Sequence, residues 1–208
     1  MIKIGLTGGI CSGKSFVLSL FEQVGAYTIK ADEISKSILF GDNPLVKKEI
    51  ADKIGLPISS GSDLDYKNFA EIIFADPEKR LLINRIVHPR VKEIRNGIIS
   101  DVEKSKKYQL LIYESALLVE AGTYRDFDRV VVVYCNRETQ VERLMDRDKI
   151  TRLEAEKKIK SQLPLPEKLK IAHYTVDTSG SMDNTYAMTL EIISLIQRDF
   201  NLKLDLIK

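Results

Sequence analysis

Apolar residues along this chain gather in short unbroken runs, which alternate with longer stretches where apolar positions recur every three or four residues. The short runs are typical of buried strands in a parallel sheet, and the longer stretches are typical of amphipathic helices. We expect strands at residues 2–7, 26–29, 108–113, 129–135 and 174–177. Strands that alternate with helices predict an α/β fold with a parallel five-stranded sheet flanked by helices.

The segment from Pro44 to Lys107 carries only the helical period, so we expect no strand in it. A turn-rich stretch at 59–63 separates two of its helices. Asp76-Pro77-Glu78 combines a cap, a first-turn proline and an acidic residue, which together predict the start of a helix. His88-Pro89 is interpreted as the start of the next helix. His88 is expected either to cap and pack or to touch a substrate.

The residues after the first expected strand match the pattern G-x-x-x-x-G-K-[ST] through Gly8, Gly13, Lys14 and Ser15. A strand precedes the motif and an amphipathic helix at 16–24 follows it, which is the context that the motif needs. In this arrangement backbone N–H groups and the positive end of the helix dipole bind phosphate oxygens. Lys14 would reach the β- and γ-phosphates, and the Ser15 hydroxyl would bind Mg²⁺. The alternative is a Gly-rich turn that only caps a helix, but we expect this chain to bind a nucleoside triphosphate.

Two carboxylates follow expected strands. Asp32 lies just after the second strand, where a helix running to Phe40 begins, and it is either the N-cap of that helix or a general base facing the phosphate loop. Glu114 closes the apolar run of the third strand and resembles a Walker-B acid, which would hold Mg²⁺ directly or through water.

Asn136 is expected to cap a helix in which Gln140, Arg143 and Arg147 share one face. Arginines that follow the ligand edge of a strand are candidates for clamping a phosphoryl group in transfer. The alternative is a solvated basic face. Two more helices are expected, one from the capping box at Thr151 and one from Ser181.

Composition limits the classes of function. The chain has 32 Lys and Arg residues against 30 Asp and Glu residues, so its formal net charge of +2 does not indicate a nucleic-acid binder. No apolar run of about 18 residues is present, and the N-terminus is the first strand rather than a signal peptide. With only Cys11 and Cys135, we expect a cytoplasmic protein with reduced thiols. We predict no obligate protein partner.

The order of motifs over nearly the whole chain resembles the dephospho-CoA kinase family. The resemblance rests on the phosphate loop, Ala31-Asp32, His88-Pro89, the Leu117-Leu118-Val119-Glu120 stretch and the Gln140, Arg143, Arg147-Asp148 pattern. Gln162, Glu167-Lys168 and the segment 172–180 also fit. The phosphate loop alone is generic, whereas the ordered set is specific.

The resemblance implies a P-loop kinase fold with a helical CoA-binding insertion and a lid, and phosphorylation of the ribose 3′-hydroxyl of dephospho-CoA with ATP and Mg²⁺. The core would span 1–40, 108–135 and 174–208, the acceptor domain 41–107 and the lid 136–173. Asp32 would be the general base, assisted by Lys14, Arg143 and Arg147. The implied ligand sets are these: for ATP, Gly8, Gly9, Ile10, Cys11, Ser12, Gly13, Lys14, Ser15 and Phe16; for the acceptor, Asp32, His88, Leu117 and Glu120; for Mg²⁺, Ser15 and Glu114.

The sequence departs from the family pattern at several positions. The family usually has Gly at Cys11, Asp at His173 and Asn at Thr178, so details of adenine binding are open. Because Cys11 lies near a helix N-terminus and a lysine, positive potential is expected to favour its thiolate and make it the more reactive thiol. The alternative is that its side chain points into the protein.

Two other functions are weighed. A different small-molecule kinase of the same fold, acting on a nucleoside or nucleotide, would differ in its acceptor domain. A GTPase-type switch is less consistent with the sequence. The loose D-x-x-G matches at 52–55 and 177–180 are not followed by an Asn/Thr-Lys-x-Asp guanine-reading motif.

Overall fold

The computed structural model of the protein describes residues 1–41, 43–55 and 76–204. It divides the chain into two compact units. Unit 1 comprises Met1–Lys30 and Val102–Lys208, and unit 2 comprises Ala31–Asp101. The expected helical insertion at 41–107 differs from unit 2 at both ends. Unit 2 begins earlier, at Ala31, with the helix that follows the second strand, and it ends earlier, at Asp101.

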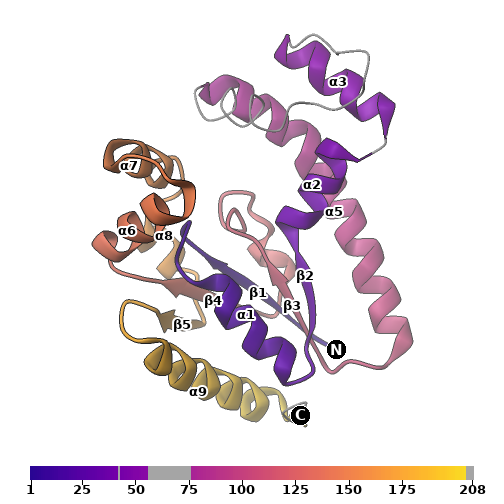
Figure 1. The fold of residues 1–208 in the computed structure, drawn as a ribbon. Helices are drawn as coiled ribbons and strands as arrows, with labels where there is room; N and C mark the ends of the chain where they lie inside the picture. Colours follow the sequence, from indigo (N-terminus) through magenta and orange to yellow (C-terminus); the bar gives the residue numbers. More distant parts are fainter. Residues whose placement is uncertain (42, 56–75, 205–208) are drawn as a thin grey trace. The chain divides into compact units, whose positions relative to one another are not determined.

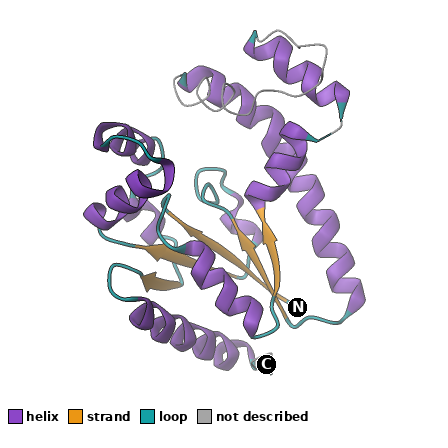
Figure 2. Cartoon of the chain, in the orientation of Figure 1, coloured by secondary structure: helices purple, strands orange, loops and turns teal. Residues whose placement is uncertain are grey.

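Unit 1 contains a five-stranded parallel sheet, which confirms the expected α/β class (Figure 2). Its strands are β1 (Ile2–Gly8), β2 (Tyr27–Lys30), β3 (Leu110–Glu114), β4 (Arg129–Tyr134) and β5 (Tyr174–Asp177). They lie in the order β2-β3-β1-β4-β5, and every neighbouring pair is parallel. The expected strands are confirmed with shifts at their ends. β1 is central, so the phosphate loop that follows it leaves the middle of the carboxyl edge of the sheet.

Two helices cover one face of this sheet. α1 (Lys14–Gln23) and α9 (Met182–Phe200) lie side by side against it (Figure 1). Their apolar faces meet strand side chains in one fully buried core, which includes Ile4, Leu6, Val17, Phe21, Ile112, Val131, Ile193 and Ile196. Burying each such side chain contributes about 1.5–3 kcal/mol to the free energy of unfolding, so this core fixes the start of α1 against the end of β1.

The C-terminal half of unit 1 adds a short 3₁₀ helix, η1 (Thr123–Asp126), and three α-helices, α6 (Arg137–Asp148), α7 (Arg152–Lys160) and α8 (Leu165–Leu169). α6 and α7 pack on each other through a small buried cluster of Val141, Leu144, Ala155 and Ile159. The expected helix starts are confirmed at Asn136, at the Thr151 capping box and at Ser181.

Unit 2 is helical in its described residues. α2 (Ala31–Phe40) and α3 (Pro44–Ile54) precede α5 (Pro77–Ser105), whose last turn belongs to unit 1. The Asp76 carboxylate accepts from the N–H groups of Glu78 and Lys79, as expected for its cap. The expected turn at 59–63 lies outside the described residues.

The prediction that a helix begins at His88-Pro89 is wrong, because α5 runs through Pro89 without a break. Proline has no N–H to donate to the carbonyl four residues earlier. That carbonyl belongs to Arg85. The Arg90 guanidinium donates to the carbonyl of the next residue, Ile86, at 2.7 Å, and to Glu49 of α3 at 2.9 Å. Pro89 thus lies inside one long helix, with Arg90 bonded beside it. No helix among the described residues is long and apolar enough to span a membrane.

Candidate active site

The phosphate loop connects β1 to α1 and has the geometry that the motif predicts. Gly13 precedes the helix with φ 83°, a left-handed conformation that favours glycine. The Lys14 ammonium group turns back over the loop and donates to the carbonyls of Gly8 at 3.3 Å and Gly9 at 2.9 Å. The only cationic group of the motif is thus held at the loop, where it can meet a phosphate.

Ser15 and Glu114 are the oxygen donors expected for Mg²⁺. Ser15 is exposed at the start of α1, and Glu114 is buried at the carboxyl end of β3, in register with Leu6 of β1. No cluster of three or more Asp, Glu, His or Cys residues that could hold a metal occurs in the described part of the chain. One hydroxyl and one carboxylate suit Mg²⁺, which usually completes its shell with water and substrate phosphates.

Two glutamines contact the phosphate loop at Ile10. The Ile10 N–H donates to Gln162 Oε1 at 2.8 Å, and Gln140 Nε2 donates to the Ile10 carbonyl at 2.8 Å. Neither glutamine was among the expected site residues, although both belong to the motif order. No local pattern marks a glutamine that bonds a backbone segment more than a hundred positions away.

Arg143 points toward the turn between β5 and α9. Its guanidinium donates to the Thr178 hydroxyl at 3.0 Å and to the Thr178 carbonyl at 2.7 Å. The same hydroxyl donates to the Ser12 carbonyl of the phosphate loop at 2.9 Å. Arg143 is therefore part of the phosphate-loop environment rather than of a solvated basic face.

Arg147 has a different environment. Its side chain is 55% exposed and pairs with Asp148 at 2.8 Å, and Asp148 also binds Lys158 of α7 at 2.7 Å. Hydrogen bonds from Arg147 and Lys158 hold the pKa of Asp148 below its ordinary value. The structure thus separates the two arginines, with Arg143 against the Thr178 turn and Arg147 at the surface.

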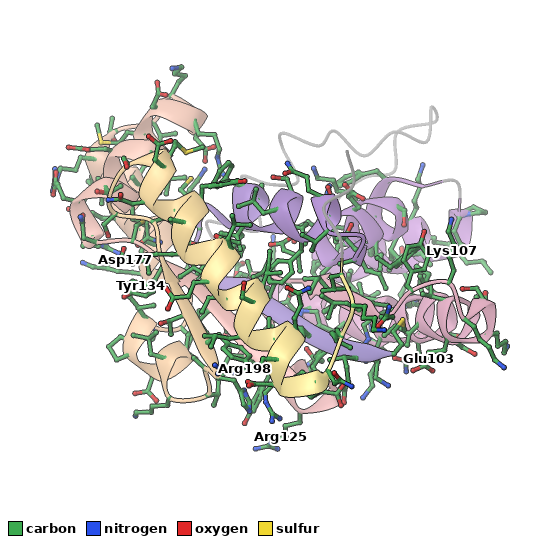
Figure 3. All side chains as sticks on the ribbon, turned by 90° about the horizontal axis from the view of Figure 1, so that it is seen from below. Glu103, Lys107, Arg125, Tyr134, Asp177 and Arg198 are labelled. Atoms are coloured by element: carbon green, nitrogen blue, oxygen red, sulfur yellow. The ribbon has the colours of Figure 1, made fainter. Side chains whose placement is uncertain are left out.

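The turn that carries Thr178 is shaped by the ends of β4 and β5. Tyr134 and Asp177 lie next to each other there, as Figure 3 shows, and they are paired in register. Asp177 accepts from the N–H and the hydroxyl of Ser179 at 2.8 and 2.6 Å, and Ser179 Oγ accepts from the Asn136 N–H at 2.7 Å. These bonds link the turn to the start of α6.

Glu120, expected to bind the acceptor, is engaged within the protein. Lys168, whose side chain is 1% exposed, contacts both of its carboxylate oxygens at 2.7 and 3.0 Å and also donates to the Ala116 carbonyl at 2.7 Å. Leu117, between these two partners, is half-buried. A fully buried lysine needs such pairing, which indicates that Glu120 stabilises the loop after β3.

Asp32 and His88 belong to unit 2. Asp32 is the second residue of α2, so the N-cap alternative is wrong. Its carboxylate is exposed and makes no hydrogen bond or ion pair with the described residues. His88 is half-buried within α5, and burial lowers its pKa.

Cys11 differs from the expectation of a stabilised thiolate. Burial raises the pKa of the Cys11 thiol, and the opposing effect of Arg147 and Lys14 does not reverse this. Its side chain packs with Ile10 and Met145 against the α6–α7 cluster. Its φ is 56°, the left-handed region in which a side chain is disfavoured. The Cys11 side chain therefore packs toward the protein, and its backbone adopts a conformation that favours glycine.

We expect Cys11 to react slowly with iodoacetamide at pH 7 and faster as the pH is raised, because the thiolate is the nucleophile and burial raises the pKa of this thiol. Cys135, which is buried and whose pKa is also raised, is the internal comparison. Peptide mass spectrometry across a pH series measures both rates. Rapid labelling of Cys11 at pH 7 would contradict this environment.

Comparisons with known proteins cover nearly the whole chain. A family model described as dephospho-CoA kinase matches residues 2–184. A dephospho-CoA kinase from Syntrophotalea carbinolica is 37% identical over 89% of this chain and 87% of its own length, and one from Bacillus licheniformis is 38% identical over 92% and 95%. A solved dephospho-CoA kinase from Campylobacter jejuni, 26% identical, has a TM-score of 0.70 over 96% of this chain and 98% of its own.

Proposed function

The chain belongs to the dephospho-CoA kinase family, and we propose on this basis that it transfers the γ-phosphoryl group of ATP to the ribose 3′-hydroxyl of dephospho-CoA, giving CoA and ADP. The observation that carries the proposal is the agreement of the family over residues 2–184 with an intact phosphate loop at the centre of the sheet. Phosphoryl transfer requires mainly positioning and charge, which this loop is built to supply.

We assign the chemistry to residues on this physical basis. Lys14, at the loop carbonyls, would neutralise charge on the β- and γ-phosphates. Asp32 would accept the proton of the acceptor hydroxyl, because it is an exposed carboxylate that no described group engages. Ser15 and Glu114 would hold Mg²⁺, which when bound neutralises phosphate charge as it develops.

The same proposal assigns acceptor binding and lid closure to the two regions outside the core. Unit 2, with His88, would hold the acceptor, and the segment 136–173 would act as the lid. Leu117 would contact the acceptor, and Glu120 would contribute to acceptor binding by holding, with Lys168, the loop after β3 that carries Leu117. A cytoplasmic location agrees with two free cysteines, Cys11 and Cys135.

An acceptor panel tests the function. The purified protein is given ATP and Mg²⁺ with dephospho-CoA, with CoA, or with nucleosides and nucleoside monophosphates, and ADP release is measured. Only dephospho-CoA should be phosphorylated, because CoA already carries the 3′-phosphate. Preference for a nucleoside or nucleotide would favour another kinase of this fold.

A lid role for Arg147 predicts a separation of binding from turnover. Because its exposed guanidinium would meet the phosphates only when the lid closes, Arg147→Ala should lower kcat more than it weakens ATP binding. Arg147→Lys should rescue poorly, since the planar fork is lost. The matched control is Arg152→Ala, which removes another exposed arginine that pairs with Glu138. Steady-state kinetics and ATP titration together measure the effect, and an unchanged kcat would leave Arg147 as a surface residue.

For Arg143→Ala the same proposal predicts both a lower kcat and weaker ATP binding. Its bidentate contact with Thr178, whose hydroxyl donates to the Ser12 carbonyl, supports the phosphate loop itself.

A further inference from the structure

The Ile10 peptide groups in the phosphate loop are held from two sides. Gln162, two residues after the end of α7, accepts the Ile10 N–H, and Gln140 of α6 donates to the Ile10 carbonyl, both at 2.8 Å. A backbone N–H requires an acceptor and a carbonyl requires a donor, so each glutamine uses a different end of its amide. Together they satisfy both polar groups of one residue in the middle of the loop.

Gly9 provides the space for this contact. A Cβ at Gly9 would lie 2.5 Å from Gln140 Nε2. Unlike Gly8 and Gly13, Gly9 has no positive φ, so its backbone conformation does not require glycine. A methyl group at this position would instead have to displace the amide end of the Gln140 side chain.

Both glutamines stand on fixed supports. Leu163, next to Gln162, donates its N–H to Glu120 Oε1 at 3.0 Å, and Glu120 is held by the buried ammonium group of Lys168. On α6, one turn after Gln140, the Arg143 guanidinium is bound to Thr178. The position of Ile10 is thus set by the loop after β3 and by the turn after β5.

We propose that Gln140 and Gln162 are positioning residues that fix the orientation of the Ile10 peptide groups and thereby the arrangement of loop N–H groups that binds the triphosphate of ATP. The proposal rests on the proposed function for the identity of the ligand. Because these two contacts fix the Ile10 peptide groups from within the protein, nucleotide binding would not have to supply that ordering. Losing either contact should therefore weaken nucleotide binding, while the acceptor site is left unchanged.

The first test is direct ATP binding by isothermal titration calorimetry. Gln140→Ala and Gln162→Ala should each raise the Kd for ATP by roughly three- to tenfold, the effect of one hydrogen bond of ordinary strength. The KM for dephospho-CoA should not change. The matched control is Gln109→Ala, because Gln109 also bonds both backbone groups of one residue, Lys203, at the start of β3 and away from the loop. It should leave the Kd for ATP unchanged.

Glutamate substitutions separate positioning from general loss of packing. In Gln162→Glu a carboxylate oxygen can still accept the Ile10 N–H, whereas in Gln140→Glu nothing remains to donate to the Ile10 carbonyl. Both variants add one negative charge beside the loop. Gln140→Glu should therefore bind ATP more weakly than Gln162→Glu, and equal affinities would contradict the assigned contacts.

A double-mutant cycle tests the link to Gly9. Gly9→Ala should weaken ATP binding in the wild-type background because its methyl group displaces Gln140. In the Gln140→Ala background the same change should cost less, so the two effects should not add. Melting temperatures of all variants check that the fold is kept.

The outcomes distinguish the inference from the function on which it rests. If the wild type does not bind ATP, the proposed function fails. If the wild type binds ATP and both alanine variants bind it as tightly as the wild type does, the positioning role is overturned. It is also overturned if the losses of ATP affinity caused by Gly9→Ala and Gln140→Ala are fully additive.

Discussion

Asp32→Asn is expected to lower kcat by roughly 10²-fold or more, because the amide keeps the shape of the carboxylate but cannot accept the proton of the 3′-hydroxyl. ATP binding should be nearly unaffected, since the phosphate loop is unchanged. Single-turnover kinetics with saturating ATP and dephospho-CoA measure the chemical step directly.

The matched control for this variant is Glu33→Gln, which removes the neighbouring carboxylate in the same first turn of α2. It accounts for the small loss of helix stability when an acidic residue leaves that turn. Near-normal turnover of Asp32→Asn, or an equal loss in Glu33→Gln, would remove Asp32 from the mechanism.

Lys14→Ala should lower kcat/KM by roughly 10²–10³-fold, as expected for the loss of a preorganised group that meets developing charge. The ammonium group already lies at the carbonyls of Gly8 and Gly9, so little rearrangement separates it from a bound phosphate. The loss should appear in both ATP affinity and turnover, because this charge would meet the β- and γ-phosphates in the ground state as well.

Lys149→Ala provides the comparison for Lys14. Lys149 is an exposed lysine that pairs with Asp146 at 2.7 Å near the end of α6. It should change activity little, because exposed ion pairs contribute weakly. Similar activity of Lys14→Ala and Lys149→Ala would contradict the assignment of the loop as the phosphate site.

Strong local patterns were sufficient to predict most of unit 1. β3 and β4 are nearly unbroken apolar runs, and the Thr151 capping box fixes the start of α7 through two short-range bonds. The phosphate loop could be predicted equally well, since its chemistry depends on residues within one stretch of sequence. The boundary between the two units, after Lys30, leaves no such pattern, because it lies between a strand and the helix that directly follows it.

The prediction of helix starts from proline failed at one position. Pro77 begins α5 as the pattern predicts, but Pro89 lies inside the same helix. Pro89 leaves the Arg85 carbonyl without its helical donor, and the Arg90 guanidinium donates to the next carbonyl, that of Ile86, beside the proline. The same guanidinium also binds Glu49 of α3, so these contacts depend on a separate helix that no residue near Pro89 indicates.

The remaining differences come from contacts between distant parts of the chain. Neither the bonds of Gln140 and Gln162 to Ile10 nor the burial of Lys168 against Glu120 leaves a signal in nearby residues. Cys11 illustrates the same limit, because local charge favours a thiolate whereas packing against α6 and α7 opposes it. Burial by distant residues decides the pKa there.

The most direct test of the central claim is ³¹P NMR of the product formed from ATP, Mg²⁺ and dephospho-CoA by the wild-type protein. The account predicts one new phosphomonoester on the ribose 3′-oxygen, formed in step with ADP and absent in Asp32→Asn over the same interval. A phosphate at another position, or ATP consumption without phosphorylation of dephospho-CoA, would contradict it.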